Sequence, residues 1–231
     1  MSLGYVLQLG DDALIAAQRL SEWVSRAAEL EEDMALANIA LDQLGQARLL
    51  LSYAGELEGR GRTEDDLAYL RTDREFRNCQ LVELENGDFA VTIGKLLFFA
   101  AYQHELYQRL AGHSDERLAG IAAKAVKETA YHVDHATIWT LRLGDGTEES
   151  HRRMQAAVDA LWPYTHELFE DNALRPAWLS TVEKVLAEAT LTRPQDGWAP
   201  TGGRQGIHTE AFSYLLGEMQ SLHRMHPGAR W

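Results

Sequence analysis

Apolar residues recur every three or four positions in four long stretches of the chain. This spacing places them along one face of a helix, so it predicts amphipathic helices. The predicted helices cover residues 11–29, 31–58, about 89–111 and 115–143. Glycines separate these stretches, and glycine permits the backbone geometry that ends a helix. Four long helices joined mostly by short connections therefore account for the first two thirds of the sequence.

The connection between the second and third predicted helices is longer than the others. It runs from Gly59 to Asn86 and contains an extra helical turn or two at residues 64–70. A long crossover of this kind joins the helix pairs of ferritin-like bundles. Shorter helices are predicted at residues 148–171, 176–191 and 208–225. We therefore expect an all-α protein with one domain over residues 1–231: a ferritin-like four-helix bundle (about 11–143) with additional C-terminal helices (about 147–226).

Charge and cysteine content narrow the classes of function. The formal net charge is −13, with no cluster of Lys and Arg, which argues against nucleic acid as a partner. The single cysteine, Cys79, excludes an intramolecular disulfide and is expected to pack inside the protein in a reducing compartment. The longest apolar run, residues 96–102, is too short to cross a bilayer, and the N-terminus lacks the features of a signal peptide. We expect a cytoplasmic protein with no membrane partner.

Polar residues on two of the predicted apolar faces lie at the spacing of a metal site. A di-iron centre in a helix bundle needs a Glu from each of two helices and a Glu-x-x-His pair from each of the other two. At that spacing the second helix carries Gln43 and Gln46, and the fourth carries Thr129 and His132. Buried polar groups need hydrogen-bond partners. We therefore expect the two glutamines to lie in an interior network and His132 to be a hydrogen-bonded core histidine.

Several motifs are shared with a known family. The longest is Thr201-Gly-Gly-Arg-Gln-Gly-Ile-His-Thr-Glu210, and the others include Leu9-Gly-Asp-Asp12, Leu41-Asp-Gln-Leu-Gly-Gln-Ala-Arg48 and Lys127-Glu-Thr-Ala-Tyr-His132. With these motifs the chain closely resembles, over essentially its whole length, the C subunits of ring 1,2-phenylacetyl-CoA epoxidases, which are ferritin-like proteins of phenylacetate degradation.

The resemblance implies a non-catalytic structural subunit of an epoxidase complex. It implies pairing with a related catalytic A subunit that carries the di-iron centre, together with further epoxidase subunits and an NADPH-dependent reductase. It implies neither a cofactor nor a catalytic residue in this chain. Compared with the ligand pattern of the catalytic subunit, the chain has six vestigial metal positions. They are Glu22 on the first helix, Gln43 and Gln46 on the second, Ala100 on the third, and Thr129 and His132 on the fourth.

The charge at these six positions is too small for two metal ions. Two divalent cations about 3.5–4 Å apart repel by on the order of 20 kcal/mol at an effective dielectric constant of about 20, and bridging carboxylates normally offset this repulsion. Glu22 is the only carboxylate among the six, and we expect it to form an internal ion pair or an amide contact. The sequence therefore predicts no metal in this chain.

Two other functions stay open at this point. The chain could be a di-iron enzyme or a metal-handling ferritin relative whose ligands are Glu22, Glu105, Glu128, His132 and His135. Alternatively, it could be a freestanding interaction protein that forms a homodimer when isolated, as helix bundles with exposed apolar faces commonly do. The part of the chain after Gly146 is a candidate partner surface because it holds four aromatics of the kind enriched at interfaces, with core packing as the alternative. These are Trp162, Trp178, Trp198 and Trp231.

Overall fold

The computed structural model describes residues 2–169 and 172–229. Within these ranges the chain forms helices and no β-strand, which confirms the predicted all-α class. The chain divides into two compact units: unit 1 is Met1–Glu85 with Thr201–Trp231, and unit 2 is Asn86–Pro200. Unit 1 thus combines both ends of the chain, whereas unit 2 is one continuous segment. A single domain over residues 1–231 stays a prediction.

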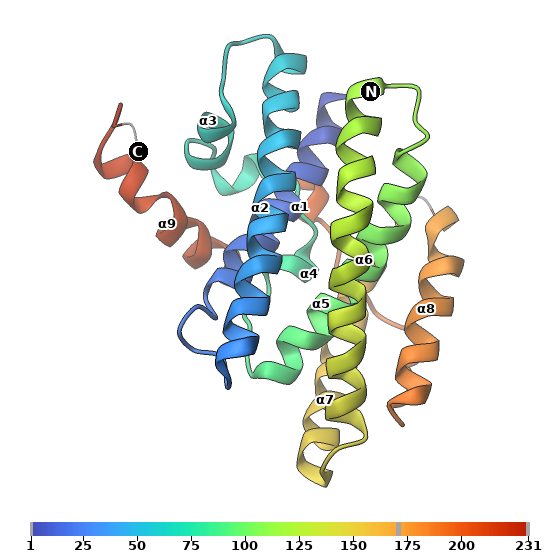
Figure 1. Ribbon diagram of the computed structural model, residues 1–231. Coiled ribbons are helices and arrows are strands. Elements are labelled where there is room, and N and C mark those ends of the chain that lie inside the picture. The colour runs from blue at the N-terminus through green and yellow to red at the C-terminus, as the bar shows by residue number, and fades with distance from the viewer. Residues whose placement is uncertain (1, 170–171, 230–231) are drawn as a thin grey trace. The chain divides into compact units, whose positions relative to one another are not determined.

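Unit 1 is built on a helix pair, α1 (Leu3–Ser21) and α2 (Leu30–Glu58), drawn in blue in Figure 1. The Ser2 hydroxyl begins α1 by accepting a hydrogen bond from the Tyr5 amide at 3.3 Å. At Gly10 the two helices approach so closely that an added Cβ would lie 2.9 Å from Leu51 Cδ2. Glycine at this position therefore permits the antiparallel packing of α1 against α2.

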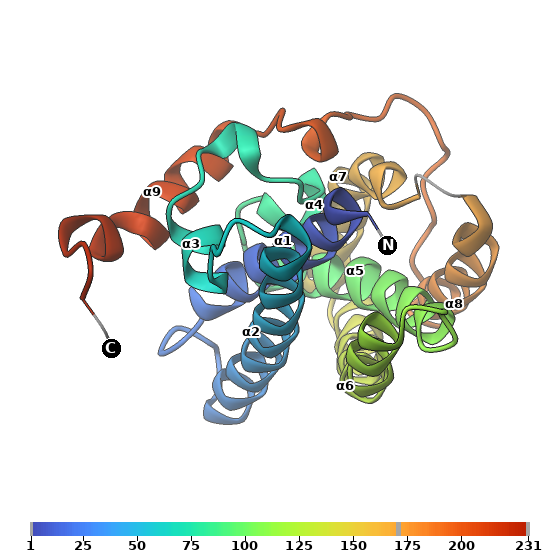
Figure 2. The same ribbon diagram turned by 90° about the horizontal axis from the view of Figure 1, so that it is seen from above.

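The remainder of unit 1 is the crossover after α2 and the C-terminal segment. Its elements are α3 (Glu64–Tyr69), η1 (Asp73–Glu75), α4 (Gln80–Glu83), η4 (Gly203–Gln205) and α9 (Glu210–Met225), where η denotes a 3-10 helix. The predicted turn at residues 64–70 is α3, and a capping box of Thr63 and Asp66 begins it. α9 lies beside α3 in Figure 2, and the Gln220 amide donates to the Ala68 and Arg71 carbonyls. The end of the chain thus returns to its first third.

Unit 2 contains a second antiparallel pair, α5 and α6, with shorter helices packed on it. Its elements are α5 (Phe89–Leu110), α6 (Glu116–Gly144), α7 (Glu148–Leu161), η2 (Trp162–Leu168), η3 (Asn172–Leu174) and α8 (Arg175–Glu188). Four rings from α5, η2, the residue after η2 and α8 form its aromatic core, with centroid distances of 5.1–5.9 Å between contacting rings: Phe98, Trp162, Phe169 and Trp178. None of the described helices, in either unit, combines the length and the hydrophobicity needed to span a membrane.

The bounds of two predicted helices are wrong. The first helix begins at Leu3 rather than residue 11 and ends at Ser21 rather than residue 29. Ser25 has a φ of 68°, which is incompatible with continuing the helix, and its amide donates to Asp33. The helix predicted over residues 148–171 ends at Leu161 and continues as η2, because Pro163 lacks the amide hydrogen that an α-helix needs. Residues 170 and 171 lie outside the described ranges.

The four tryptophans of the predicted partner surface have different environments. Trp162 and Trp178 are fully buried in the aromatic core of unit 2, so they serve packing rather than contact with a partner. Trp198 is 78% exposed, in the segment that leads out of unit 2. Trp231 lies outside the described residues. Within the described residues, Trp198 is therefore the member of this set that a partner can reach.

Candidate functional site

The vestigial metal positions of unit 1 lie on α2 and at the end of α1. Gln43 and Gln46 are buried on the same stripe of α2 as Ile39 and Leu50, so the predicted inward orientation is confirmed. Neither glutamine is without a partner. Both side chains are neutral, and they fill the interior without adding charge.

Glu22 lies outside α1, although the sequence predicted it inside the first helix. It is the C-cap residue of α1, and its side chain is 29% exposed. The guanidinium of Arg19, one helical turn earlier, donates to Glu22 Oε1 at 2.7 Å. The same guanidinium donates to the Glu83 and Ala211 carbonyls at 2.7–3.2 Å. The carboxylate of Glu22 is therefore engaged in an ion pair, one of the two roles expected for it.

The vestigial positions of unit 2 lie on α5 and α6. Ala100, Thr129 and His132 are all fully buried. The Thr129 hydroxyl donates to the Ala125 carbonyl of its own helix at 2.9 Å, and His104 Nδ1 lies 3.2 Å from the same oxygen. Since that oxygen already donates its proton, His104 Nδ1 carries the hydrogen of this contact. The Thr129 oxygen is thus committed to two neighbours.

His104 on α5 is a polar residue that sequence reasoning missed. Its Nε2 lies 2.5 Å from the side-chain nitrogen of Gln108, which donates to it, so both ring nitrogens have partners when the hydrogen is on Nδ1. The residues are one turn apart on α5, and Thr129 is on α6. The signal for His104 was its helical spacing from Ala100, which places both residues on neighbouring positions of the same helix face.

The alternative ligand set includes Glu105, Glu128 and His135 as well as Glu22 and His132. Glu128 of α6, whose side chain is 16% exposed, pairs with Lys124 at 3.4 Å. His135 is buried beside the Tyr131 ring, 6.2 Å between centroids. Among the described residues, neither unit gathers three or more His, Cys, Asp or Glu side chains in an arrangement that could hold a metal ion.

A buried cluster of charged groups in unit 1 joins α1 to the crossover and the C-terminal segment. Asp12 of α1 accepts a hydrogen bond from Arg204 Nη1 at 2.8 Å and another from the Cys79 amide at 2.8 Å. The Arg204 guanidinium also donates to the Arg77 carbonyl at 2.9 Å. Burial raises the pKa of Asp12 above its ordinary value, and the neighbouring Arg204 lowers it only in part.

The neighbouring residue, Asp11, makes the second ion pair of this cluster. Its carboxylate accepts from both terminal nitrogens of Arg71 and from the Arg77 amide. Arg71 also lies over the Phe76 ring, 4.1 Å from the ring centre, which is a cation–π contact. Both side chains of the ion pair are at most 2% exposed. Of the two consecutive aspartates of α1, Asp11 therefore holds the crossover, and Asp12 holds both the crossover and the C-terminal segment.

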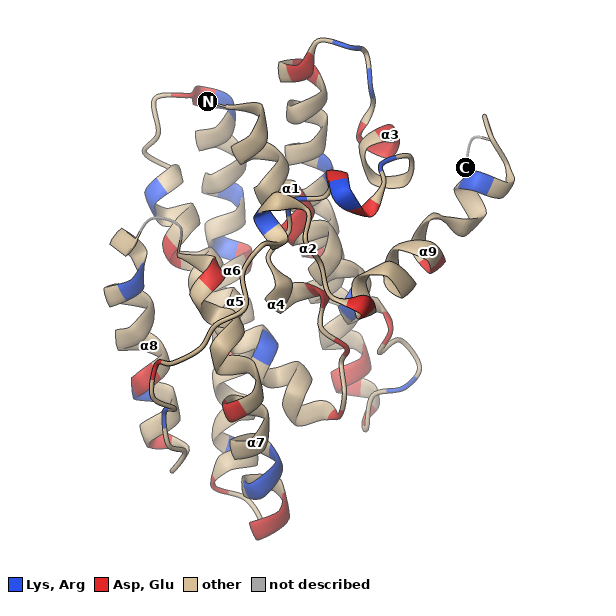
Figure 3. Ribbon diagram, turned by 180° about the vertical axis from the view of Figure 1, so that it is seen from behind, with Lys and Arg blue, Asp and Glu red and all other residues tan. Residues whose placement is uncertain are grey.

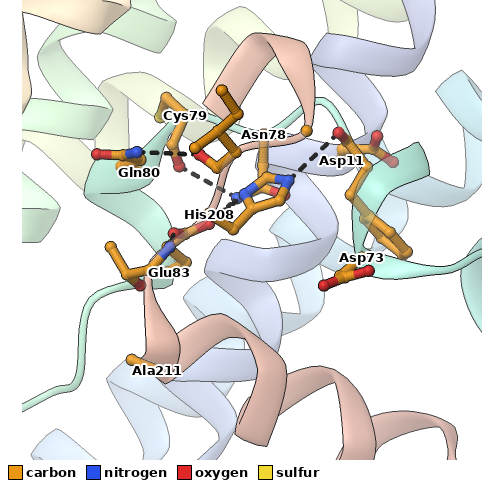
Figure 4. Close-up of polar contacts among 12 residues, drawn as sticks. Asp11, Asp73, Asn78, Cys79, Gln80, Glu83, His208 and Ala211 are labelled. Carbon is orange, nitrogen blue, oxygen red and sulfur yellow. Dashed lines mark hydrogen bonds and ion pairs between the residues drawn. The ribbon is translucent and has the colours of Figure 1, made fainter. Parts of the chain in front are cut away.

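Glu83 at the end of α4 is the centre of the third contact, shown with its neighbours in Figure 4. Its Oε2 lies 2.7 Å from His208 Nδ1 and accepts from the Asn78 side chain at 2.8 Å. Its Oε1 accepts from the Thr209 amide at 2.6 Å. On the other side of the ring, His208 Nε2 lies 3.3 Å from the Phe76 carbonyl. Glu83 thus fixes the start of α9 to the crossover.

The backbone conformation at Gly206 accounts for one of the glycines in the motif at residues 201–210. Its φ is 78°, a left-handed conformation that favours glycine, and an added Cβ would lie 2.3 Å from the Arg74 carbonyl oxygen. The turn at Gly206 lies between Arg204 and His208, whose side chains reach Asp12 and Glu83. The buried side chains of this cluster face one another and not solvent, which suits holding segments together rather than binding a substrate.

An open hollow of about 390 Å³ lies beside α7 in unit 2, lined by Asp88, Val91, Arg152, Arg153, Ala156, Ala157 and Ala160. Its two arginines are already paired: Arg152 and Arg153 donate to the Glu149 carboxylate at 2.6–2.9 Å. These hydrogen bonds lower the pKa of Glu149 to about 2. Acidic and basic residues are also interleaved along this helix in Figure 3. The arginines therefore do not form a free anion site.

Comparison with known proteins identifies the family of this chain. Residues 2–231 match the model of the family described as phenylacetic acid catabolic protein. The chain belongs to the phenylacetic acid catabolic protein family. It is similar to the C subunit of 1,2-phenylacetyl-CoA epoxidase from Escherichia coli strain K12, with 46% identity over 243 residues that cover 98% of each chain. This confirms the family to which the sequence motifs pointed.

In this member of the phenylacetic acid catabolic protein family, the motifs that carried the resemblance have a structural role. Leu9-Gly-Asp-Asp12 and the motif at residues 201–210 meet through Asp12 and Arg204, which are 192 positions apart in sequence. Sequence reasoning identified both motifs but missed their contact. No periodicity or spacing signal connects such distant residues, although two aspartates on a largely buried helix implied that cations must lie near them.

Proposed function

We propose that the chain is the non-catalytic C subunit of a 1,2-phenylacetyl-CoA epoxidase, and that it pairs with the catalytic A subunit, which carries the di-iron centre. The observation that supports this most directly is 46% identity to the C subunit of the Escherichia coli epoxidase over 98% of both chains. In the complex, oxygen converts phenylacetyl-CoA to its ring 1,2-epoxide with electrons from NADPH supplied by a reductase subunit. We expect the complex to work in the cytoplasm.

The non-catalytic role rests on the residues at the vestigial metal positions, which do not fit a di-iron centre. Gln43, Gln46, Ala100 and Thr129 are neutral, and the Thr129 oxygen is shared between the Ala125 carbonyl and His104. The one carboxylate, Glu22, is paired with Arg19. Without bridging carboxylates, the repulsion between two metal ions is not offset. The chain therefore contributes stability and a docking surface to the catalytic subunit.

Iron content tests this proposal. The purified chain is mixed with ferrous salt without oxygen, desalted and analysed for metal, with the catalytic A subunit treated in the same way as the positive control. We expect well below one iron per chain for the C subunit and a filled centre in the A subunit. Two irons per chain in the C subunit would contradict the non-catalytic role and favour the alternative ligand set.

Pairing is tested separately by co-expression of the chain with a tagged A subunit. We expect the two chains to leave the affinity column together and to elute as one species in gel filtration. Epoxidase activity is expected from the assembled complex with its reductase, and none from the C subunit with the reductase alone. An untagged chain that stays in the flow-through would show that it is not the partner of the A subunit.

A further inference from the structure

One face of α2 carries a row of apolar side chains that unit 1 leaves uncovered. Leu30 is 71% exposed, Met34 59%, Leu41 63% and Leu44 37%, and Ala37 lies between them on the same face. Single exposed apolar residues are common on protein surfaces. Four in one row on one helix, with the half-buried Ala37 between them, are not, and a row of this kind marks a surface for another protein.

The spacing within the row indicates what kind of structure fits it. Successive members are four, three, four and three residues apart, which is the heptad spacing of a coiled-coil seam. Side chains at this spacing pack against a second helix that crosses at roughly 20°. The row runs from Leu30 to Leu44, about 21 Å at 1.5 Å per residue. A long helix aligned with α2 therefore fits the row better than a loop or a short peptide.

Gly45, beside the end of this row, leaves open space next to α2. It lies in the interior of α2, where glycine is less stable than alanine, yet an added Cβ would have no atom within 4 Å. At Gly10, by contrast, Leu51 of the same unit fills the space beside the glycine. Packing inside unit 1 therefore leaves the space beside position 45 open, and a helix docked on the row can approach the backbone of α2 closely there.

The charges around the row select between partners. Glu29 and Glu31 are exposed at its start. Arg48, at the far end, is paired with Glu64 at 3.5 Å. A second copy of the chain would bring the same row, the same acids and the same net charge of −13. A helix with Lys or Arg near the start of α2 is complementary instead.

We propose that the face of α2 formed by Leu30, Met34, Ala37, Leu41, Leu44 and Gly45 is the docking surface for a long helix of the catalytic A subunit. That helix has apolar residues at heptad spacing and basic residues opposite Glu29 and Glu31. This inference rests on the proposed function, because it names the face through which the proposed pairing occurs.

The first test changes the centre of the row. Leu41→Glu, in the full chain, is titrated against the purified A subunit, and the dissociation constant is compared with that of the wild type. We expect binding to weaken by about 30-fold or more, as for a central interface residue. Leu57→Glu is the matched control, because Leu57 is 38% exposed on the opposite face of the same helix. Its dissociation constant is expected to stay within about twofold of the wild type.

The second test uses a substitution whose effects on folding and on pairing have opposite signs. Gly45→Leu is expected to raise the midpoint of thermal unfolding of the isolated chain by about 2–4 °C, because leucine favours the helix and has space there. The same variant is expected to lose binding to the A subunit. The control is Gly120→Leu on α6, where an added Cβ also has no atom within 4 Å. It should raise the midpoint similarly and bind as the wild type does.

The outcomes separate this inference from the proposed function. If the wild-type chain does not bind the A subunit at all, the proposed function fails and this docking site fails with it. If the wild type binds and both Leu41→Glu and Gly45→Leu bind equally well, the docking site is wrong while the proposed function stands. If the isolated wild type is a dimer that Leu41→Glu dissociates, with binding to the A subunit unchanged, the row belongs to a second copy and the inference is overturned.

Discussion

In unit 1, three buried carboxylates, those of Asp11, Asp12 and Glu83, each face a basic side chain from a distant segment. The interior of unit 2 instead contains an aromatic core, formed by the rings of Phe98, Trp162, Phe169 and Trp178. This difference reflects whether each unit is continuous in the sequence. Unit 1 joins segments nearly 200 residues apart, and its directional ion pairs specify which segments meet. Unit 2 is one continuous segment, and burial of apolar surface is enough to hold it together.

The two interiors should therefore respond differently to substitution. Desolvation offsets most of the attraction within a buried ion pair, but removing one partner leaves an uncompensated buried charge. Removing part of a ring instead costs an amount set by the lost volume and by the cavity that remains. Substitutions that separate these two costs test the comparison.

The largest effect is expected for Arg204→Met. It leaves the Asp12 carboxylate buried without its cation, and we expect a loss of about 3–5 kcal/mol in the free energy of unfolding, measured by urea titration. In the double variant Asp12→Asn with Arg204→Met the buried charge is gone, so more than half of the loss should be recovered. A single variant that loses less than about 1 kcal/mol would show that Asp12 does not depend on Arg204.

A smaller effect is expected for Trp178→Phe in unit 2. The indole Nε1 donates to the Phe98 carbonyl at 2.9 Å, and the smaller ring removes both this bond and part of the packing. We expect a loss of about 1–3 kcal/mol in the same urea titration. Trp198→Phe is the control, since an exposed position should change stability by no more than about 0.5 kcal/mol. Equal losses for the two variants would contradict the assignment of Trp178 to the core.

The smallest expected effect is on the pH dependence of stability, and it involves two carboxylates of unit 1. Burial raises the pKa of Asp12, whereas hydrogen bonds from the amide and hydroxyl of Thr63 lower the pKa of Asp66. Asp66 therefore adds stability that is present above its unfolded pKa and is lost as the pH falls through its folded pKa. Asp12 has the opposite sign, because its ionisation costs stability as the pH rises from its unfolded to its folded pKa.

Carboxyl carbon chemical shifts measured by NMR check this prediction directly. On acidification, Asp12 should gain its proton at a higher pH than Asp66. The variant Asp66→Asn should show a smaller loss of stability between about pH 5 and 3 than the wild type, by less than about 1 kcal/mol, as for one helix cap. A reversed order of protonation would mean that Arg204 outweighs burial at Asp12.

The sequence allowed the helices and their inward faces to be predicted, since periodicity is a local property. Gln43 and Gln46 are examples, because they share a stripe with Ile39 and Leu50, and that stripe indicates an interior position from the residue pattern alone. Glu22 shows the limit of the same reasoning. Val24 continues the apolar spacing past the end of α1, but the chain turns at Ser25 and Val24 is 51% exposed. Apolar spacing alone does not show where a helix ends.

The contacts that organise unit 1 could not be predicted from one sequence. Asp12 with Arg204 and Glu83 with His208 each join segments more than 100 residues apart. Their pairing depends on the path of the whole chain, and nothing in the residues themselves selects Arg204 for Asp12 among 22 Lys and Arg, or His208 for Glu83 among nine His. Of the six vestigial positions, Gln43, Gln46, Thr129 and His132 were located by helical spacing, whereas Glu22 and Ala100 were located by comparison with the family. The absence of metal from these positions stays a prediction.

The return of the C-terminal segment to unit 1 has a consequence for synthesis on the ribosome. Unit 2 is complete once residue 200 has emerged, although translation reaches it second. The aspartates of α1 are made before the C-terminal segment, so Asp12 has no Arg204 and Glu83 has no His208 until residues 204–208 have been synthesised. Residues 86–200 can thus fold before unit 1 is complete, and a polypeptide truncated before residue 204 would leave Asp12 of α1 without its counter-charge.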